Sequence, residues 1–190
     1  MNDAASIEHA VAELRAFHAR EGAVVSGRGL EPVVAGATLG VSKKTWLLPG
    51  RRERGCALLR GCPADRLDQA RPYKVVPAGE SPVARALQAV GLAGTDGALV
   101  WLGTGSVSYG GFAEALSLTK LWNARVTFVV SWYVGEGPFA PQLAASPAAL
   151  AAAMWLPAVT VDGADAEAVR AAVAGLKGQG VVVAEVRGKA

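Results

Sequence analysis

The stretch "ALVWLGTGSVSYGGFAEALSLTKLWNARVTFVVS", residues 98–131, decides the fold of this 190-residue chain. Its apolar run over 98–102 predicts a buried strand, residues 112–122 follow a helical pattern, and the apolar run over 126–131 predicts another strand. A strand, a helix and a strand in succession predict a βαβ unit, in which the two strands lie parallel in one sheet. The turn between the first strand and the helix is rich in glycine, and α/β proteins commonly hold phosphorylated ligands at such a turn.

The glycines of this turn are Gly103, Gly105, Gly110 and Gly111, and no carboxylate stands among them. Their order does not match Gly-x-Gly-x-x-Gly, so the turn is not the fingerprint of a dinucleotide-binding protein. Two interpretations stay open from the pattern alone. The glycines let a ligand approach the backbone, or they let the helix pack tightly on its neighbours.

The rest of the chain continues the α/β pattern. Toward the C-terminus the sequence predicts a helix over 147–154 capped by Ser146, a strand over 158–161, a helix over 165–176 and a strand over 181–186. Toward the N-terminus it predicts helices over 6–21, 31–39, 56–61 and 81–94. Ser6 and Ser81 are the expected N-caps, and Gly22 is expected to end the first helix. The segment 63–80 is linker-like. The strands are near-continuous apolar runs, which is typical of a parallel sheet with helices on both faces. Residues 1–190 are therefore expected to form a single α/β domain.

The composition is that of a globular protein poor in charge. Hydrophobic residues make up 52% of the chain and charged residues 18%, and there are five Trp. With so little charge, part of the surface is expected to be covered by another subunit, which predicts an oligomer. The Ala-rich helix within 144–153 is apolar on nearly all sides, so it is expected to be buried, at a subunit contact.

Several classes of protein are excluded. No apolar run approaches the roughly 20 residues of a membrane span, and the charged N-terminal segment is not a signal peptide, so a cytoplasmic protein is expected. Cys56 and Cys62 are too few for a disulfide framework and lack the companions of a zinc site, so they are expected to be free thiols. His9 and His18 lie on the first predicted helix and are expected to be solvated rather than ligands.

Positive charge is concentrated in one segment although the net charge is only +3. Between residues 43 and 60 a single acid, Glu53, stands against Lys43, Lys44, Arg51, Arg52, Arg54 and Arg60. The cluster fits an anionic ligand, an acidic partner surface or a solvated face. No recognisable nucleic-acid-binding motif accompanies it, so nucleic acid is not expected as a partner.

The motif region resembles the thiamine-diphosphate motif in the alpha subunit of the decarboxylating component of 2-oxo acid dehydrogenases. That family shows Gly-Asp-Gly, then Phe-x-Glu-Ala-Leu, then a strand followed by Glu-Asn-Asn. The chain has Gly103-Thr104-Gly105, then "FAEAL" and the strand "VTFVV". "GLEPVVAGATLGV" upstream and "MWLPAVTVDGADAEAVRAAV" downstream are similar to further family segments. The resemblance implies a thiamine-diphosphate-binding fold, and either a homodimer or a beta-type dehydrogenase subunit as partner.

The departures from the family concern its metal. In the family, the Asp of Gly-Asp-Gly and an Asn after the next strand coordinate the magnesium that bridges the cofactor's diphosphate. Here Thr104 replaces the Asp, and Ser131-Trp132-Tyr133 replaces Glu-Asn-Asn. Magnesium requires hard oxygen ligands in near-octahedral geometry, and Tyr133 cannot replace an amide oxygen. The resemblance therefore implies that the metal site is lost, and no metal-ligating or catalytic residue is expected.

The phosphate side and the catalytic loop also depart from the family. Its Tyr-Arg pair, which contacts the diphosphate, falls at Arg51-Arg52, and its His falls at Arg54, so only Arg52 is retained. The family's downstream loop, which carries catalytic His residues, is expected to be missing, because only "RGKA" follows Val186. The positions expected to face the cofactor pocket are Gly103, Thr104, Gly105, Ser108, Arg52 and Tyr133.

Three functions are compatible with these residues. The first is a degenerate alpha-type subunit with a structural or regulatory role and no cofactor, in which Trp122, Trp132 and Tyr133 fill the vacated pocket or an interface. The second is a reduced enzyme that binds thiamine diphosphate and acts on a 2-oxo acid with a beta-type partner, its magnesium relocated to Thr104, Ser108 and Glu136. The third is a metal-free binder of a phosphate ligand that uses the glycine turn with Arg51, Arg52 and Arg54.

Overall fold

The computed structural model describes residues 3–20, 27–77, 79, 81–135 and 143–187, and within them five strands form one sheet. The strands are β1 (Trp46–Leu48), β2 (Ala98–Gly103), β3 (Val126–Val134), β4 (Ala158–Asp162) and β5 (Gly180–Arg187), and their order across the sheet is β1-β2-β3-β5-β4. Every neighbouring pair is parallel, so the carboxyl ends of all five strands lie at one edge of the sheet. The predicted α/β fold with a parallel sheet is confirmed.

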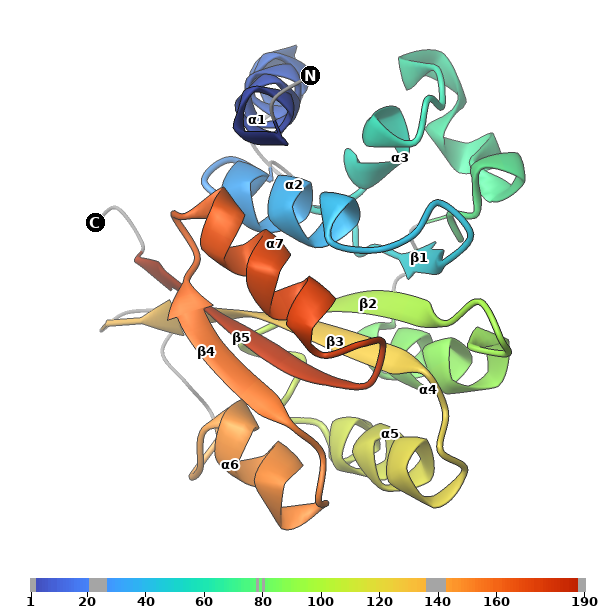
Figure 1. Cartoon of the computed structure of the whole chain (residues 1–190), viewed down its shortest axis with the longest axis vertical. Coiled ribbons are helices and arrows are strands. Elements are labelled where there is room, and N and C mark those ends of the chain that lie inside the picture. Colours follow the sequence, from blue (N-terminus) through green and yellow to red (C-terminus); the bar gives the residue numbers. More distant parts are fainter. Residues whose placement is uncertain (1–2, 21–26, 78, 80, 136–142, 188–190) are drawn as a thin grey trace.

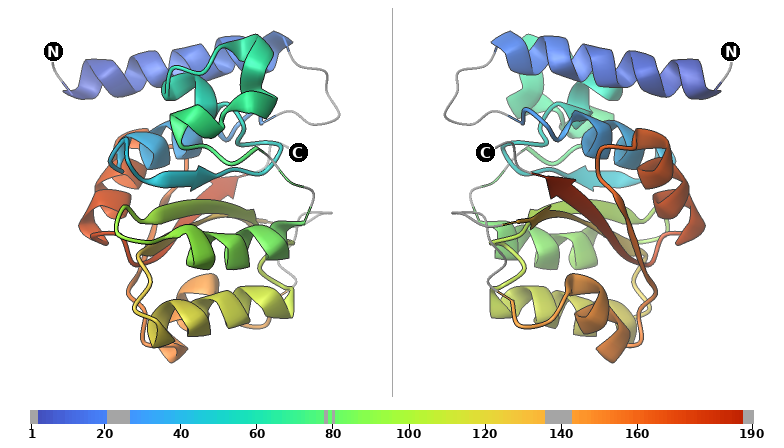
Figure 2. Two further views of the ribbon diagram at one scale, coloured as in Figure 1. Left: turned by 90° about the vertical axis from the view of Figure 1, so that its right-hand side faces the viewer. Right: turned by 90° about the vertical axis from the view of Figure 1, so that its left-hand side faces the viewer.

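Helices cover both faces of the sheet (Figure 1). One face carries α4 (Pro82–Leu92), α5 (Gly110–Leu121) and α6 (Pro147–Ala153), whereas the other carries α2 (Glu31–Leu39) and α7 (Ala166–Gly175). An outer layer, α1 (Asp3–Arg20) and α3 (Cys56–Leu59), packs against α2 (Figure 2). The chain moves across the sheet from β1 to β4 with helices on one face and returns to β5 through α7 on the other, as right-handed crossovers require. No helix in the described ranges is long and apolar enough to cross a membrane.

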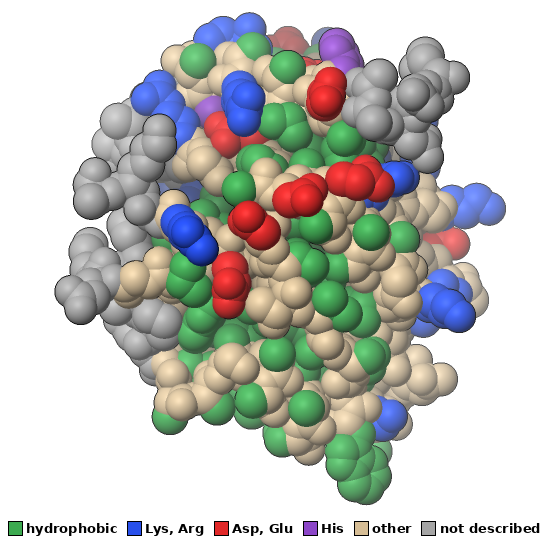
Figure 3. Space-filling view, turned by 60° about the vertical axis from the view of Figure 1, so that its left-hand side comes forward, with side chains coloured by type: hydrophobic (Ala, Val, Ile, Leu, Met, Phe, Trp, Pro, Cys, Tyr) green, Lys and Arg blue, Asp and Glu red, His purple; other side chains and the backbone are tan. Residues whose placement is uncertain are grey.

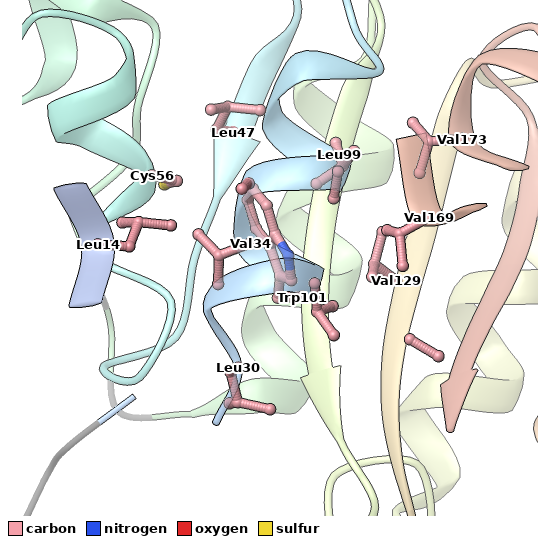
Figure 4. Packing of buried hydrophobic residues seen from close by; sticks show 14 of the residues in the cluster. Leu14, Leu30, Val34, Leu47, Cys56, Leu99, Trp101, Val129, Val169 and Val173 are labelled. Atoms are coloured by element: carbon pink, nitrogen blue, oxygen red, sulfur yellow. The ribbon is translucent and has the colours of Figure 1, made fainter. Parts of the chain in front are cut away.

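Strand residues alternate between two cores. On β2, Leu99 and Trp101 point toward α2 and α7, whereas Val100 and Leu102 point toward α4 and α5. Figure 4 shows the first core, which Leu99 and Trp101 share with Leu30, just before α2, with Val34 of α2, and with Val169 and Val173 of α7. Each side chain of this size stabilises the fold by roughly 1.5–3 kcal/mol when it is fully buried. The core thereby fixes the strand ends on which the candidate site lies.

Most predicted elements are confirmed with small differences at their ends. Ser81 and Ser146 cap α4 and α6, each accepting a hydrogen bond from a backbone N–H three residues on. Ser6 is not an N-cap, because α1 begins at Asp3 and Ser6 lies inside it, and Gly22 falls outside the described residues. The segment 63–80 is more than a linker, since it contains 3₁₀-helices at Ala64–Gln69 and Arg71–Tyr73.

Strand β1 is missing from the prediction. Its three residues are too short a run to show a period. The strand is held by parallel pairing with β2 and by an isolated bridge between Leu47 and Val75. Its position matters for function because the segment before β1 and the segment after it lie at opposite edges of the sheet.

Of two predictions about burial, that of α6 at a subunit contact stays a prediction, and that of a solvated His18 is wrong. Helix α6 is mostly accessible, with Pro147 and Ala151 as its buried residues, because it covers the sheet only at its margin beside β4. His18 is fully buried, and its Nδ1 lies 3.0 Å from Oε1 of Glu31. Burial alone would raise the pKa of Glu31, but hydrogen bonds from His18 and from the backbone N–H of Gly29 outweigh it and lower the pKa. The His18–Glu31 pair joins α1 to the start of α2.

Candidate ligand site at the carboxyl edge of the sheet

The predicted site residues gather at the carboxyl edge of the sheet. The loop 49–54 follows β1, the glycine turn 103–109 follows β2, and Gly135 follows β3. Because these three strands are adjacent and parallel, their ends meet at the edge where open α/β sheets bind ligands. Arg52, the glycine turn and Tyr133 therefore share one edge although they are far apart in sequence. Glu136 lies outside the described residues.

Thr104 joins the end of β2 to β3. The residue is only 4% exposed, and its Oγ1 donates to the carbonyl of Ser131 at 3.2 Å and accepts from the N–H of Tyr133 at 2.8 Å. The single hydroxyl proton is thus committed to the backbone. Strand β3 continues to Val134, beyond the predicted end at Ser131. Tyr133 therefore lies within the strand, and its side chain packs against the core shared with α2 and α7.

Replacing Thr104 with Val is expected to lower the free energy of unfolding by about 1–3 kcal/mol. The substitution keeps the shape of the side chain but leaves the carbonyl of Ser131 and the N–H of Tyr133 without this buried partner. Urea denaturation followed by circular dichroism measures the loss. Thr104→Ser keeps the hydroxyl and should lose less than Thr104→Val, so equal losses in the two variants would contradict a role for the hydrogen bonds.

The glycines of the turn are of two kinds. Gly111 is a packing glycine, because a Cβ at this position would collide with Cγ1 of Val83 on α4. A Cβ at Gly105 or Gly110 would meet no atom within 4 Å, and one at Gly103 would meet only Oγ of Ser106, at 3.9 Å. None of these three has a positive φ, so neither packing nor backbone conformation requires glycine there. They leave open space beside the end of β2, which favours the ligand interpretation for residues 103–110.

The two serines of the turn bond within it. Oγ of Ser108 donates to the carbonyl of Gly105 at 2.8 Å, and Oγ of Ser106 accepts from the N–H of Gly103 at 3.3 Å. Tyr109, the residue before α5, provides no side-chain cap. The first N–H groups of a helix carry partial positive charge and suit an anion. The turn therefore offers backbone donors and neutral hydroxyl oxygens, but no negative charge.

Two opposite charges are buried near each other where the basic loop meets the sheet. Glu53 is 6% exposed, and Arg85 of α4 is 8% exposed. Arg85 donates from Nη1 to the carbonyl of Gly79 at 3.0 Å and from Nη2 to that of Trp101 at 3.5 Å. A Cβ on Gly50 would lie 2.6 Å from Oε2 of Glu53 and 3.1 Å from Nη2 of Arg85, so the glycine leaves room for both charged groups. The pair links the loop after β1 to β2.

Burial acts against both charges of this pair. It raises the pKa of Glu53, and the attraction of Arg85 offsets only part of the effect. It also lowers the pKa of Arg85 from its ordinary value. Nε of Arg85 finds no hydrogen-bond partner among the described residues. Such a pair adds little net stability when intact, but removing one member leaves the other charge buried and uncompensated.

The basic cluster anticipated from the sequence does not form one patch. Lys43 and Lys44 precede β1, whereas Arg51 and Arg52 follow it, so the strand separates the two pairs onto opposite edges of the sheet. Arg60 belongs with the lysines, because its guanidinium donates to the carbonyls of Lys43 and Ser42 at 2.6 and 3.0 Å. The cluster therefore divides into two groups that cannot share one small ligand.

Arg54 is oriented differently from its neighbours in the loop. Its Cζ lies 5.8 Å from the centre of the Phe17 ring on α1. It also lines a hollow of about 340 Å³ with Asp65 and Asp68. Arg51 and Arg52, both exposed, are the arginines that remain beside the glycine turn.

The residues at the carboxyl edge do not fit the magnesium site that the resemblance implies. Oγ1 of Thr104 is engaged by two backbone groups, and Oγ of Ser131 is a single buried neutral oxygen that finds no partner among the described residues. Magnesium needs several hard oxygens, of which carboxylates are the usual protein ligands. Across the described residues, no three His, Cys, Asp or Glu side chains come together.

The aromatic residues expected in a vacated pocket lie in three different places. Trp132 packs in the core on the side of α4 and α5, and Tyr133 lies on the opposite face of the sheet. Trp122 is 62% exposed at the end of α5, at the amino edge of the sheet. The prediction that Trp122 fills the pocket is wrong, and its burial in an interface stays a prediction.

Other reactive or hollow features lie away from this edge. Cys56 and Cys62 are free, as predicted, and burial raises the pKa of both thiols, which makes them poor nucleophiles at neutral pH. A cleft of about 590 Å³ lies between α1 and α7 and contains none of the predicted site residues. Its acidic lining includes Asp162, Asp165 and Glu167.

Comparison with known proteins gives one family. A family model described as "Dehydrogenase E1 component" matches residues 75–177, which include the glycine turn, β3, β4 and α7. The basic loop with Arg51 and Arg52 lies before the matched range. No curated protein sequence matches the chain.

Proposed function

Because this chain belongs to the family of the dehydrogenase E1 component, we propose that it is an alpha-type 2-oxo acid dehydrogenase subunit without catalytic activity. Proteins of this family depend on thiamine diphosphate. The proposed subunit keeps the fold and an assembly surface and acts as a structural or regulatory partner of other subunits. Membership of the family supports the type of subunit, and the residue chemistry at the carboxyl edge supports the loss of activity.

The observation that carries the proposal is the pair of hydrogen bonds made by Thr104. At the position where the resemblance implies a metal-binding carboxylate, this side chain joins β2 to β3 instead. The position has become part of the strand pairing and offers no charge. Since Tyr133 is also committed to the strand and the core, both positions implied as ligands serve the fold.

Thiamine diphosphate with magnesium is expected to leave the melting temperature unchanged. A ligand at about 100 times its dissociation constant stabilises a protein by about 2.7 kcal/mol. In a domain of this size, such a stabilisation raises the melting temperature by roughly 5–10 °C. A rise of that size, or carbon dioxide release from a 2-oxo acid when the chain is mixed with a beta-type subunit, would contradict the proposal.

A second candidate function is a metal-free site for a phosphate ligand. It is supported by the open space at Gly105 and Gly110, together with the exposed Arg51 and Arg52 at the same edge. Guanidinium groups pair well with phosphate oxygens in two-point contacts. Inorganic pyrophosphate should then raise the melting temperature equally with and without EDTA, and Arg52→Gln should reduce the rise. Pyrophosphate that has no effect in EDTA would exclude this function.

A further inference from the structure

Strand β4 has an unpaired outer edge among the described residues. It is the last strand of the sheet, and its partner is β5. The carbonyl of Pro157 accepts from Val181 at 2.9 Å, and the N–H of Gly163 donates to Glu185 at 2.7 Å. Since alternate residues of a parallel strand bond to the same neighbour, the backbone groups of Ala158, Thr160 and Asp162 point away from β5.

In the part of the chain that the structure describes, this edge lacks the usual protection against pairing. Proteins commonly shield edge strands with lysine, proline, a bulge or a covering segment. Val159, Thr160 and Asp162 are exposed, and Val159 is 39% exposed. The first charge is Asp162 at the end of the strand, and its Oδ1 accepts from the N–H of Ala164 at 2.9 Å. The stretch from Ala158 to Val161 therefore presents an open, uncharged edge.

The surface beside this edge is also apolar. Residues 143–161 contain no charged side chain. Trp155, between α6 and β4, is 81% exposed, and its φ of 56° is the left-handed conformation that ends α6, where the N–H groups of Trp155 and Leu156 bond back to the carbonyls of Ala152 and Ala151. Figure 3 shows hydrophobic side chains and few charges over the lower part of this face, below a row of acidic side chains. An exposed Trp beside an open strand edge marks a surface for a partner.

We propose that β4 pairs antiparallel with β4 of a second copy of this chain, about a two-fold axis at Thr160, so that two sheets join into one. A contact of this symmetry brings the same surface against itself. With the axis at Thr160, Val159 lies opposite Val161, and Ala158 lies opposite Asp162, so no like charges meet. The uncharged surface of 143–161 then faces its own copy, which suits a like partner better than a charged one. The pairing does not depend on whether the carboxyl edge binds a cofactor.

A cysteine at the axis tests the register directly. Residues that face each other in such a pair have Cα atoms about 5.5 Å apart, within the range of a disulfide. Thr160→Cys should give a covalent dimer on mild oxidation, whereas Asp162→Cys, which lies four residues from its own copy along the paired strands, should not. The native cysteines are buried, so their background is low. Equal cross-linking of the two variants would overturn the proposed register.

Sedimentation velocity tests the pairing without a cross-link. The wild-type chain should sediment with a mass of twice 19.4 kDa. Runs at protein concentrations from about 1 to about 100 µM test whether the dimer dissociates. Thr160→Pro removes an outward N–H without loss of a bond to β5 and should give a folded monomer, whereas Thr160→Ser should remain dimeric. Circular dichroism verifies that the proline variant is folded.

Trp155→Gly is a second, independent variant. Glycine relaxes the positive φ and removes the exposed indole, so the monomer should be at least as stable while the dimer dissociates more readily. A wild-type chain that stays monomeric at every concentration would overturn the proposal. So would a Thr160→Pro dimer as tight as the wild type, or a β4 edge occupied by a beta-type subunit instead.

Discussion

Arg85→Met is expected to lower the free energy of unfolding by about 3–5 kcal/mol at pH 8. The substitution removes the buried guanidinium that faces Glu53 and that bonds to the carbonyls of Gly79 and Trp101. Glu53 then keeps only its backbone hydrogen bonds and the weaker attraction of Arg52 against burial, which already raises its pKa. Urea denaturation of the purified variant measures the loss.

The size of this loss should depend on pH. A carboxyl whose folded pKa is raised stabilises the folded state fully below its unfolded pKa, here 4.5, and loses that contribution as pH rises toward the folded pKa. Without Arg85 the pKa of Glu53 rises further, because a charge that lowers it is gone. The destabilisation by Arg85→Met should therefore be smaller at pH 5 than at pH 8.

The matched control replaces both members of the pair. Glu53→Leu combined with Arg85→Met leaves no buried charge, and buried ion pairs replaced by apolar residues are often neutral or stabilising. The double variant should recover most of the stability lost in Arg85→Met, with little dependence on pH between 5 and 8. A double variant as unstable as the single one would show that packing of the arginine, rather than the charge of Glu53, sets the loss.

Gly36→Ala is expected to lower the free energy of unfolding by about 3 kcal/mol, at the upper end of what overpacking usually costs. Gly36 lies where α2 meets α7. A Cβ there would collide with the carbonyl of Ala166, and it would lie 2.9 Å from Cβ of Val169 and 3.1 Å from the backbone N of Arg170. Because most of these atoms belong to the backbone of α7, they cannot rotate away, and the two helices must separate.

The same substitution at Gly91 is the control. Gly91 also lies inside a helix, α4, but a Cβ there would meet no atom within 4 Å. Gly91→Ala should raise the free energy of unfolding by about 0.5–1 kcal/mol, because alanine favours the helix and restricts the unfolded chain. Thermal or urea denaturation should thus give opposite signs at the two positions. A loss at Gly36 no larger than a few tenths of a kcal/mol would contradict the close helix contact.

The parts of the fold that could be predicted are those with long patterns. The apolar runs at 98–102 and 181–186 form strands because burial on both faces demands continuous apolar residues. Strand β1 has three residues, and its place depends on neighbours that are distant in sequence. The apolar composition of α6 indicates a surface to be covered, but it does not say by what. Within the chain the helix is mostly accessible, and its burial at a subunit contact stays a prediction.

The candidate site could be predicted in its location but not in its bonding. Parallel strands bring their carboxyl ends together, so Gly103 and Tyr133 could be assigned to one edge. The spacing of residues does not show that Thr104 bonds across to β3, or that Glu53 and Arg85 are buried near each other, since both arrangements depend on the path of the chain in space. The separation of Lys43 from Arg51 depends on β1, which was not predicted.

Thr104 makes two hydrogen bonds that an aspartate at this position could not both make. An aspartate at position 104 would accept the N–H of Tyr133, as Thr104 does, but as a carboxylate it has no proton to give to the carbonyl of Ser131. Two acceptor oxygens would then face each other at a strand end that is nearly closed to water. Thr104→Asp alone is therefore expected to lower the stability of the folded chain.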